Sequence, residues 1–457
     1  MGCLKKMLHH STSSNISKTY NLHGDLKLTI EVKSNPNNFS PDALFEMGVR
    51  INKKRNFLFV SRLLGKHLAV DPAISLATGS ILASMLLENE GQKPLPQLDE
   101  IVEMVNSGIP NRALNAKSLA YKAKLPTKTV FIGFAETATG LGHAVFNHFY
   151  DATYIHTTRE EIINLKPSFY FEEEHSHATS HRVYAPEEIL MEAETIVLVD
   201  DEITTGLTAS NLIAALSKSF PDKQYKVLSI LDWRSDDQRS EFNHVMKARG
   251  ISAEVISILS GQFLLSNEAS IEEKELTYLE GKKKFELFTD TALTTPVTST
   301  YYSTHASYNT FTGRFGLTAD HHEEMEEWIQ NMIFKLPSID RNKSTLVIGV
   351  GENIYFPLRF ALAFGEKTKV QTTTRSPIFA KNEKSYPIKQ KCKFTLPDSN
   401  GIDQYIYNLA EVEAEQIIVI AESVKEKTTW FPLLTHLENL APVTWISLTM
   451  PYEEGGE

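Results

Sequence analysis

Short runs of apolar residues alternate with amphipathic segments through the middle of the chain. Val, Ile, Leu and Phe follow one another in the expected strands, whereas apolar residues recur every three or four positions in the expected helices. Near-continuous apolar strands joined by such helices are typical of a parallel sheet covered on both faces. The pattern predicts strands at 128–136, 152–158, 195–201 and 225–233, and helices at 140–150, 186–194 and 208–220.

The residues before this alternation carry weaker signals. One strand is predicted at 25–32, inside a polar segment that runs to about residue 40. The stretch 56–70 is apolar with inserted basic residues. A helix is predicted from Asp71, because Pro72 suits the first turn of a helix.

A second alternation begins near residue 344, after an aperiodic stretch that is charged and then rich in Ser and Thr. Such a long irregular stretch is unusual inside a compact domain, so it indicates a boundary. The second alternation predicts strands at 344–352, 368–374, 416–422 and 442–450, and helices at 355–364, 403–413 and 430–440. We therefore predict a polar N-terminal segment (1–40), an α/β domain (41–262), a connection (263–312) and a smaller Rossmann-like α/β domain (313–457).

Composition excludes several classes of function. The 457 residues carry a formal net charge of -11, which argues against general nucleic-acid binding because a polyanion needs a basic surface. No apolar run is long enough to span a bilayer, and the N-terminus lacks the apolar core of a signal peptide. Cys3 and Cys392, the two cysteines, cannot form a disulfide framework, which fits a reducing cytoplasm.

The stretch 195–212, "TIVLVDDEITTGLTASNL", carries the clearest chemistry. Asp200 and Asp201 follow an apolar strand directly, at the end of the sheet where ligands of parallel sheets bind. Adjacent carboxylates need partners outside the core, such as hydroxyl groups or a cation. The next loop opens a helix, so its backbone N–H groups can converge on one anion. Hydroxyl acceptors beside a phosphate cradle predict a ribose 5-phosphate ligand.

The segment "VLVDDEITTGLT" resembles the motif by which type I phosphoribosyltransferases, such as the orotate-specific ones, bind phosphoribosyl pyrophosphate (PRPP). The resemblance implies that Asp200 and Asp201 are catalytic residues that hold the ribose hydroxyls. The alternative is an ordinary strand–turn–helix in which Asp and Thr only cap the helix. The implied 5′-phosphate site consists of Thr204, Thr205, Gly206, Leu207 and Thr208.

The segment 133–142, "GFAETATGLG", ends the first predicted strand of the sheet and opens a helix. The resemblance implies that backbone N–H groups here bind the pyrophosphate of PRPP. Glu136 suits that place only if magnesium or a basic side chain lies between it and the pyrophosphate. A purely structural Gly-rich turn is the alternative. The implied pyrophosphate-binding residues are Ala135, Glu136, Thr137, Ala138 and Lys66.

Positive charge is also needed to neutralise the leaving pyrophosphate. Arg159 follows the second strand, where the family places charged residues near PRPP, and is a predicted catalytic residue. Lys66 and His67 are further candidates, although a lysine can also snorkel from an apolar element. The polar segment 166–188 is expected to be a flexible loop that closes over the reacting centre. Its candidate residues are His175, His177, His181 and Arg182, for which zinc binding is disfavoured because no cysteine lies near.

The resemblance implies displacement of pyrophosphate from PRPP by a base or an amine, through an oxocarbenium-like transition state. Mg²⁺ would be held mainly by substrate oxygens and water, with no direct protein ligand. A variable hood, before residue 90 or within 262–290, would select the acceptor. A non-catalytic PRPP-binding regulator and a pyrophosphate-dependent cleavage of a nucleotide are alternatives. The expected partners are PRPP and a small-molecule acceptor, without nucleic acid or membrane; a homodimer and proteins of the same gene cluster are also considered.

The segment 370–378, "VQTTTRSPI", together with the upstream "VIGVGENIYFPLRFALA", resembles the TRSP domain. That domain is named after a tetrapeptide that is present here at residues 374–377. That domain follows a phosphoribosyltransferase domain in proteins of tellurium-resistance and stress gene clusters, which implies a role in making a nucleotide-like metabolite. Two neighbouring strand ends predict a second ligand site, with Gly349 and Arg314 nearby. An Arg–Glu ion pair that closes a turn is the alternative. The predicted residues are Gly351, Glu352, Arg375 and Ser376.

Overall fold

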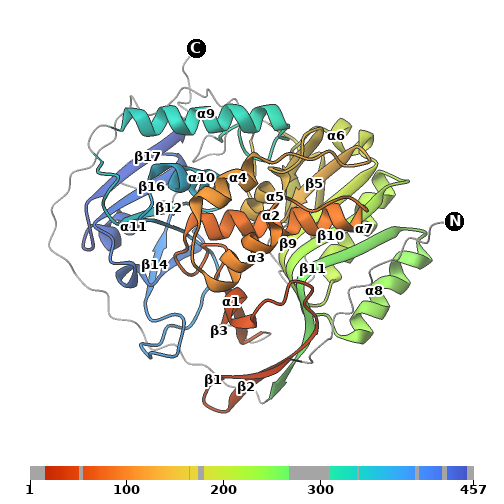
Figure 1. The fold of residues 1–457 in the computed structure, drawn as a ribbon, viewed down its shortest axis with the longest axis horizontal. Coiled ribbons are helices and arrows are strands. Elements are labelled where there is room, and N and C mark those ends of the chain that lie inside the picture. Colours follow the sequence, from red (N-terminus) through yellow and green to blue (C-terminus); the bar gives the residue numbers. More distant parts are fainter. Residues whose placement is uncertain are drawn as a thin grey trace.

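The computed structural model describes residues 16–50, 55–163, 165–172, 180–266, 308–336, 339–396, 401–424 and 430–449. Within these residues, two mainly parallel sheets lie side by side, and helices flank both (Figure 1). The N-terminal half of the chain forms a seven-stranded sheet, and the C-terminal half forms a four-stranded one. The predicted fold class, a parallel α/β sheet followed by a smaller α/β unit, is confirmed.

The seven-stranded sheet has a switch in strand order at its centre. The chain runs from β5 outward to β6, crosses to β9 on the other side of β5, and continues to β10 and β11. These five strands are parallel, and β2 and β1 extend the sheet in antiparallel fashion. In sheet order the strands are β1 (Ser17–His23), β2 (Leu26–Ser34), β11 (Ser252–Ser266), β10 (Gln224–Asp232), β9 (Thr195–Ile203), β5 (Thr129–Gly133) and β6 (Ala152–His156).

Helices cover the seven-stranded sheet on both faces. The helix predicted from Asp71 is confirmed as α2, where the Asp71 carboxylate caps the N-terminus by accepting from Ala73 N. Almost every residue of α2 is buried, since α5 covers one side and α3 and α4 cover others. The helices are α2 (Pro72–Asn89), α3 (Leu98–Ser107), α4 (Arg112–Ala120), α5 (Ala138–Phe146), α6 (Glu187–Glu192), α7 (Leu207–Ser219) and α8 (Asp236–Ala248).

Two hairpins stand over the carboxyl end of this sheet. The first follows the short helix α1 (Pro41–Leu44) and consists of β3 (Phe45–Val49) and β4 (Phe57–Ser61). Its aromatic side chains pack on Trp233, which follows β10. The second hairpin consists of β7 (Phe169–Glu172) and β8 (Ser180–Val183).

The four-stranded sheet is wholly parallel, in the order β13 (Thr368–Thr372), β12 (Thr345–Gly349), β16 (Gln416–Ser423), β17 (Val443–Thr449). Helices α9 (Ala319–Lys335), α10 (Tyr355–Phe364) and α11 (Phe431–Leu437) flank it. A separate hairpin joins β14 (Lys391–Thr395) to β15 (Asp403–Tyr407), which the 3₁₀ turn η2 (Leu409–Val412) follows.

Several predicted elements differ from the structure. The helix predicted at 403–413 is wrong: aromatic and β-branched residues of 403–407 pair with β14 as a strand, and only one 3₁₀ turn follows. Helices α8 and α9 were not predicted, although α9 buries a face that includes Met325, Trp328, Ile329 and Met332. The N-terminal region holds two strands where one was predicted.

The two sheets are joined along their edges and through their helices. Tyr154 of β6 exchanges two backbone hydrogen bonds of 2.8 Å with Leu317, so the segment before α9 extends the N-terminal sheet. Helices α2 and α5 pack against α10, and one apolar cluster includes Leu76, Ala144 and Phe360 from both halves. The loops at the carboxyl ends of the two sheets are therefore fixed relative to each other. The proposed connection 263–312 lies mostly outside the described residues, and the division of the chain there stays a prediction.

Candidate functional site

The paired aspartates lie near the end of β9, on the switch point of the sheet. β9 continues two residues beyond its predicted end, because Ile203 still pairs with Asp232 of β10. Asp200 and Asp201 are partly buried, and Asp200 Oδ1 accepts from Asp201 N at 2.8 Å. Burial and the neighbouring charge of Asp201 raise the pKa of Asp200 well above its usual value. Such a pair is stabilised by a ligand that brings hydroxyl donors or a cation.

The loop after β9 presents a helix N-terminus. Gly206 is the N-cap of α7, and its φ of 80° is in the left-handed region that favours glycine. A Cβ there would lie 2.8 Å from Cδ of Arg234. Thr205 Oγ1 accepts from Leu207 N at 3.3 Å, whereas the hydroxyls of Thr204 and Thr208 form no hydrogen bond with other described residues. One threonine thus serves as a cap and two remain available for an anion at the helix N-terminus.

The loop after β5 is the second strand-to-helix loop at the switch point. Ala135 N donates to Thr157 Oγ1 at 2.9 Å, and the Ala135–Glu136 peptide bond is cis. Lys66 Nζ donates to Thr137 Oγ1 at 2.5 Å and lies 3.9 Å from Glu136 Oε2. A basic side chain therefore lies beside Glu136. The sequence analysis required either such a side chain or magnesium between this carboxylate and the pyrophosphate.

The backbone of Arg159 is held on both sides just beyond β6. Arg159 N donates to Glu352 Oε1 at 3.1 Å, and Arg182 Nη1 donates to Arg159 O at 3.1 Å. Arg182 belongs to β8, whose backbone also pairs with Thr158. The segment carrying Arg159 is thus shaped by the C-terminal sheet and by the β7–β8 hairpin.

The segment expected to be a flexible loop is partly regular. His181 of β8 is buried, stacks on Phe171 and hydrogen-bonds Thr157 Oγ1 at 2.9 Å. His181 is therefore a core residue of the hairpin, with its ring packed and one ring nitrogen hydrogen-bonded. The expectation that it belongs to a mobile loop is corrected. His175 and His177 lie outside the described residues.

Sequence reasoning missed three charged residues around the site. Arg55 Nη2 donates to Glu202 Oε1 at 2.6 Å, which ties the β3–β4 hairpin to the end of β9. Burial and the positive charges of Arg55 and Arg159 lower the pKa of Arg50, which directly follows β3 of the same hairpin. The basic content of the stretch from 50 to 55 was the available signal, but its pairing with β9 needs the fold.

The predicted ligand site of the C-terminal half has the expected residues, but its acidic residue, Glu352, bonds to other parts of the protein. Gly349, Gly351 and Glu352 follow β12, and Arg375 and Ser376 follow the neighbouring β13, as predicted. The Glu352 carboxylate, however, already accepts from protein groups. Its two oxygens accept from Arg159 N and Arg314 Nη2.

An arginine at the centre of three carboxylates explains the position of Glu352. Arg314 is 1% exposed and lies 3.0 Å from Glu352, 2.8 Å from Glu422 and 3.5 Å from Glu160. Burial alone would raise the pKa of Glu352, but the positive charge of Arg314 and the hydrogen bond from Arg159 N lower it instead. The alternative Arg–Glu ion pair is thus present, formed by Arg314 rather than Arg375.

The two predicted sites are neighbours. Thr374 Oγ1 donates to Glu136 Oε2 at 3.2 Å, and Thr139 Oγ1 lies 3.1 Å from Glu352 O. The loops after β12 and β13 therefore touch the loop between β5 and α5. Residues from both halves of the chain line one continuous region.

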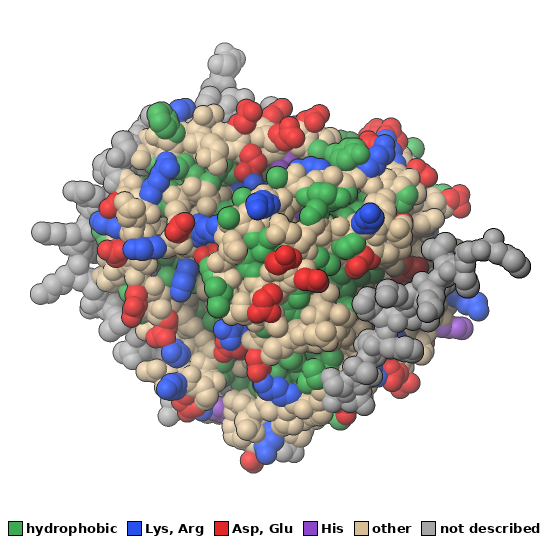
Figure 2. All heavy atoms as spheres, viewed as in Figure 1, with side chains coloured by type: hydrophobic (Ala, Val, Ile, Leu, Met, Phe, Trp, Pro, Cys, Tyr) green, Lys and Arg blue, Asp and Glu red, His purple; other side chains and the backbone are tan. Residues whose placement is uncertain are grey.

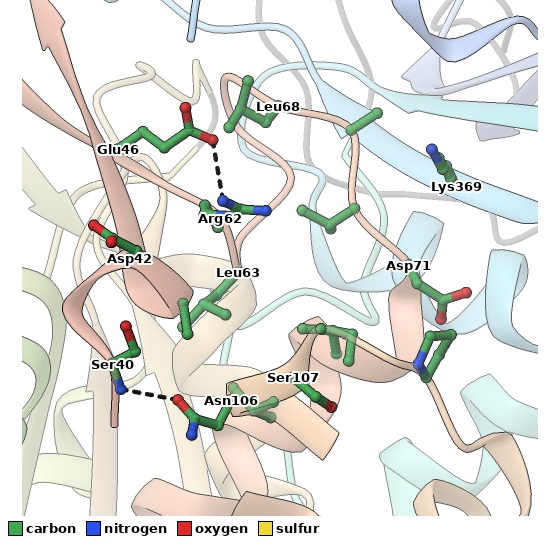
Figure 3. A pocket seen from close by; sticks show the side chains of 17 residues that line it. Ser40, Asp42, Glu46, Arg62, Leu63, Leu68, Asp71, Asn106, Ser107 and Lys369 are labelled. Carbon is green, nitrogen blue, oxygen red and sulfur yellow. Dashed lines mark hydrogen bonds and ion pairs between the residues drawn. The ribbon is translucent and has the colours of Figure 1, made fainter. Parts of the chain in front are cut away.

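A separate hollow of about 600 Å³ lies under the first hairpin (Figure 3). Glu46 and Arg62 pair at 3.4 Å on its rim, and Lys369 of β13 lies across from them. The loop 62–71 lines this hollow and also carries Lys66. No residue predicted to bind PRPP lines the hollow.

The described surface carries no single dominant charge on the face in Figure 2, where basic and acidic side chains are interspersed. Within the described part of the chain, no helix is long and apolar enough to cross a membrane. In the same residues, no group of three or more His, Cys, Asp or Glu is arranged to hold a metal ion.

Comparison with protein families identifies the class of both halves. Residues 44–262 match the family described as phosphoribosyl transferase. Residues 311–437 match the TRSP domain, which is described as lying C-terminal to that phosphoribosyl transferase domain. The chain belongs to the proteins that join these two domains, as its sequence motifs predicted.

Solved structures with a similar fold are type I phosphoribosyltransferases. Adenine phosphoribosyl transferase from Trypanosoma brucei, in complex with AMP, pyrophosphate and ribose-5-phosphate, is 12% identical over 50% of this chain and 82% of its own, with a TM-score of 0.28. Orotate phosphoribosyltransferase from Mycobacterium tuberculosis is 10% identical over 47% and 89%, with a TM-score of 0.23. The Giardia lamblia adenine enzyme is 13% identical over 29% and 70%, with a TM-score of 0.21. A search of curated proteins finds no match.

Proposed function

We propose that the protein transfers the phosphoribosyl group of PRPP to a base or amine acceptor and releases pyrophosphate. The observation that carries the proposal is the junction of β9 and α7, where Asp200 and Asp201 stand beside an open helix N-terminus. Carboxylates accept from vicinal hydroxyls, and the helix N-terminus binds a phosphate. A pentose 5-phosphate presents these two groups together.

The roles of the site residues follow from their positions at the switch point. Asp200 and Asp201 hold the ribose hydroxyls, and the 5′-phosphate lies in the loop 204–208. The pyrophosphate lies along the loop 135–138, where Lys66 supplies positive charge. In the reaction the bond from C1 of the ribose to pyrophosphate breaks, a bond from C1 to the acceptor nitrogen forms, and the acceptor proton leaves. In this proposal Arg159 offsets the charge that develops on the pyrophosphate.

Magnesium fits this site through PRPP more than through the protein. The carboxylate oxygens of Asp200 and Asp201 are hard donors, and Asp200 gains from a nearby cation because burial and Asp201 raise its pKa. Most ligands of the ion would be substrate oxygens and water. Mg²⁺ supplies neutralisation of the pyrophosphate, while the protein residues orient the ribose and exclude water.

Calorimetry with PRPP and Mg²⁺ tests the ribose contact. We expect the double variant Asp200→Asn, Asp201→Asn to bind PRPP at least a hundredfold more weakly, with an unchanged circular dichroism spectrum. The matched control is Asp236→Asn, Asp237→Asn, an exposed pair of adjacent aspartates in the first turn of α8, which we expect to bind normally. Wild-type affinity in the first variant would contradict the proposed ribose contact.

A product screen tests the reaction. Incubation with PRPP, Mg²⁺ and single bases or amines, followed by mass spectrometry, should reveal one ribosylated product with stoichiometric pyrophosphate. Tight PRPP binding without product from any acceptor, cell extract included, would favour a non-catalytic PRPP-binding regulator. Formation of PRPP from a nucleotide and pyrophosphate would instead show that the same site works in the cleavage direction.

A further inference from the structure

One short segment of the TRSP domain, residues 370–379, contacts three elements near the pyrophosphate side of the site. Its first contact is with the loop that carries Lys66. Val370 and Val70 exchange backbone hydrogen bonds of 2.9 and 2.8 Å, and Thr372 N donates to Gly65 O at 2.7 Å. The Lys66 loop is therefore attached to β13 by an isolated β-bridge and one further backbone hydrogen bond, and its position depends on the C-terminal sheet.

The second contact is with the loop between β5 and α5. Thr374 Oγ1 donates to Glu136 Oε2 at 3.2 Å and accepts from Ser376 N at 3.2 Å. The Glu136 side chain is 9% exposed and also lies within 3.9 Å of Lys66 Nζ. Glu136 is thus held between one residue of each domain, and this sets the shape of the loop.

The third contact is with Arg50, the residue directly after β3. Arg50 forms a β-bridge with Ile378, and Phe379 N donates to Val49 O at 2.8 Å. The next contact along is the hydrogen bond of 2.9 Å from Val49 N to Tyr386 Oη. The backbone of Arg50 is therefore set by the TRSP domain.

The side chain of Arg50 has no anion of its own among the described residues. Its Nε atom is buried without a hydrogen-bond partner, and the structure gives its guanidinium no ion pair. Glu202, the acid near it, is already bonded to Arg55. Burial, and after it the positive charges of Lys66 and Arg50, lower the pKa of His67, so both cations lie near this ring. Arg50 is partly buried, and an arginine with a buried, unbonded Nε and no ion pair of its own is stabilised when a ligand supplies an anion.

We propose that residues 370–379 form a wall of the phosphoribosyltransferase site and that Arg50, which this wall positions, binds the pyrophosphate of PRPP. The inference rests on the proposed function and deepens it. The TRSP domain and the phosphoribosyl transferase domain then share one active site. The tetrapeptide Thr374 to Pro377 acts there as a support for the pyrophosphate loop.

The substitution Arg50→Met in the full chain tests the ligand contact. Calorimetry with Mg²⁺ should show binding of inorganic pyrophosphate and of PRPP weakened about ten- to a hundredfold, the range expected for loss of charged hydrogen bonds. Ribose 5-phosphate, which lacks the pyrophosphate, should bind as it does to the wild type. The matched control is Arg62→Met in the same hairpin region, because Arg62 is exposed and pairs with Glu46.

The substitution Thr374→Val tests the wall itself, since it removes the hydroxyl that bonds Glu136 and keeps the side-chain shape. We expect pyrophosphate binding to weaken about three- to tenfold while ribose 5-phosphate binding is unchanged. Thr435→Val, at an exposed threonine of α11, is the control.

The outcomes separate the two proposals. Unchanged pyrophosphate binding in Arg50→Met would overturn the inference and leave the proposed function standing. Equal loss of pyrophosphate and ribose 5-phosphate would mean a general structural defect, and would overturn the inference as well. A wild-type protein that binds neither PRPP nor ribose 5-phosphate would overturn the proposed function and this inference with it.

Discussion

The ribose and 5′-phosphate half of the candidate site takes its residues from one stretch of chain, from Asp200 to Thr208. The pyrophosphate half collects Lys66, Glu136 and Arg159 from separate loops, and the TRSP domain contacts all three of these loops. The first half needs only a strand that turns into a helix. The second half needs two sheets to be fixed against each other.

This difference teaches where sensitivity to mutation should lie. A contiguous half tolerates loss of distant contacts, because its geometry follows from local hydrogen bonding. A half assembled from loops far apart in sequence depends on the interface between the sheets. Changes at that interface should therefore affect pyrophosphate before they affect ribose 5-phosphate.

The largest effect is expected from Arg314→Met. The substitution leaves Glu160, Glu352 and Glu422 buried together without their cation. Breaking a buried ion network in this way costs about 3–5 kcal/mol. Urea unfolding should show that loss, and the surviving folded protein should bind pyrophosphate poorly but ribose 5-phosphate well. Arg341→Met, at an exposed arginine, should change stability by less than about 0.5 kcal/mol; a similar small change in Arg314→Met would refute the role of this network.

A smaller effect is expected from acid, and its sign differs between two buried histidines of the N-terminal domain and Asp200 of the ribose half. Burial lowers the pKa of His156 to about 4 and of His148 to about 3, so both stay neutral when folded. The unfolded chain takes up protons near pH 6.5, and stability falls below that pH by about 1.4 kcal/mol per pH unit for each histidine. In contrast, burial and Asp201 raise the pKa of Asp200, so acid relieves strain in the ribose half.

Unfolding measured from pH 7 to pH 5 checks this dependence. The variant His148→Gln should show a shallower decline than the wild type, because one buried titrating group is removed. His244→Gln, at an exposed position of α8, should decline as steeply as the wild type. Equal slopes in all three proteins would contradict the burial effect.

The smallest effect is expected from a comparison of two glycines, Gly206 of the phosphoribosyl transferase domain and Gly351 of the TRSP domain. Gly206 and Gly351 have φ values of 80° and 61°, so alanine costs about 1–2 kcal/mol of backbone strain at either. At Gly206 the new Cβ also meets Arg234, beside the phosphate loop, whereas nothing lies within 4 Å at Gly351. Calorimetry should show ribose 5-phosphate binding weakened about tenfold by Gly206→Ala and little changed by Gly351→Ala. The reverse order would argue against a phosphate at Gly206.

Local patterns predicted much of the fold. The strands at β5, β9, β10, β12 and β16 and the helices α2, α7 and α10 lie within a few residues of their predicted bounds, because continuous apolar runs and helical periodicity are local signals. The helix predicted at 403–413 failed because the short apolar run of β15, DQYIY, is too brief to show either a strand or a helix period. The actual pairing with β14 comes from residues about ten positions away.

The candidate site, like the fold, has a part that local sequence predicts and a part that depends on distant contacts. The sequence by itself determined the pair Asp200–Asp201 and the loop to Thr208, since a carboxylate pair, a glycine and a helix start are all contiguous. Only the tertiary structure decided that Glu352 pairs with Arg314, that Thr374 hydrogen-bonds Glu136, and that the backbone of Arg50 pairs with Ile378. These contacts join residues more than thirty positions apart, and in several cases more than two hundred. Hydrogen bonds and ion pairs act over a few ångströms, so such partners are set by how the two sheets pack and leave no local pattern in the chain.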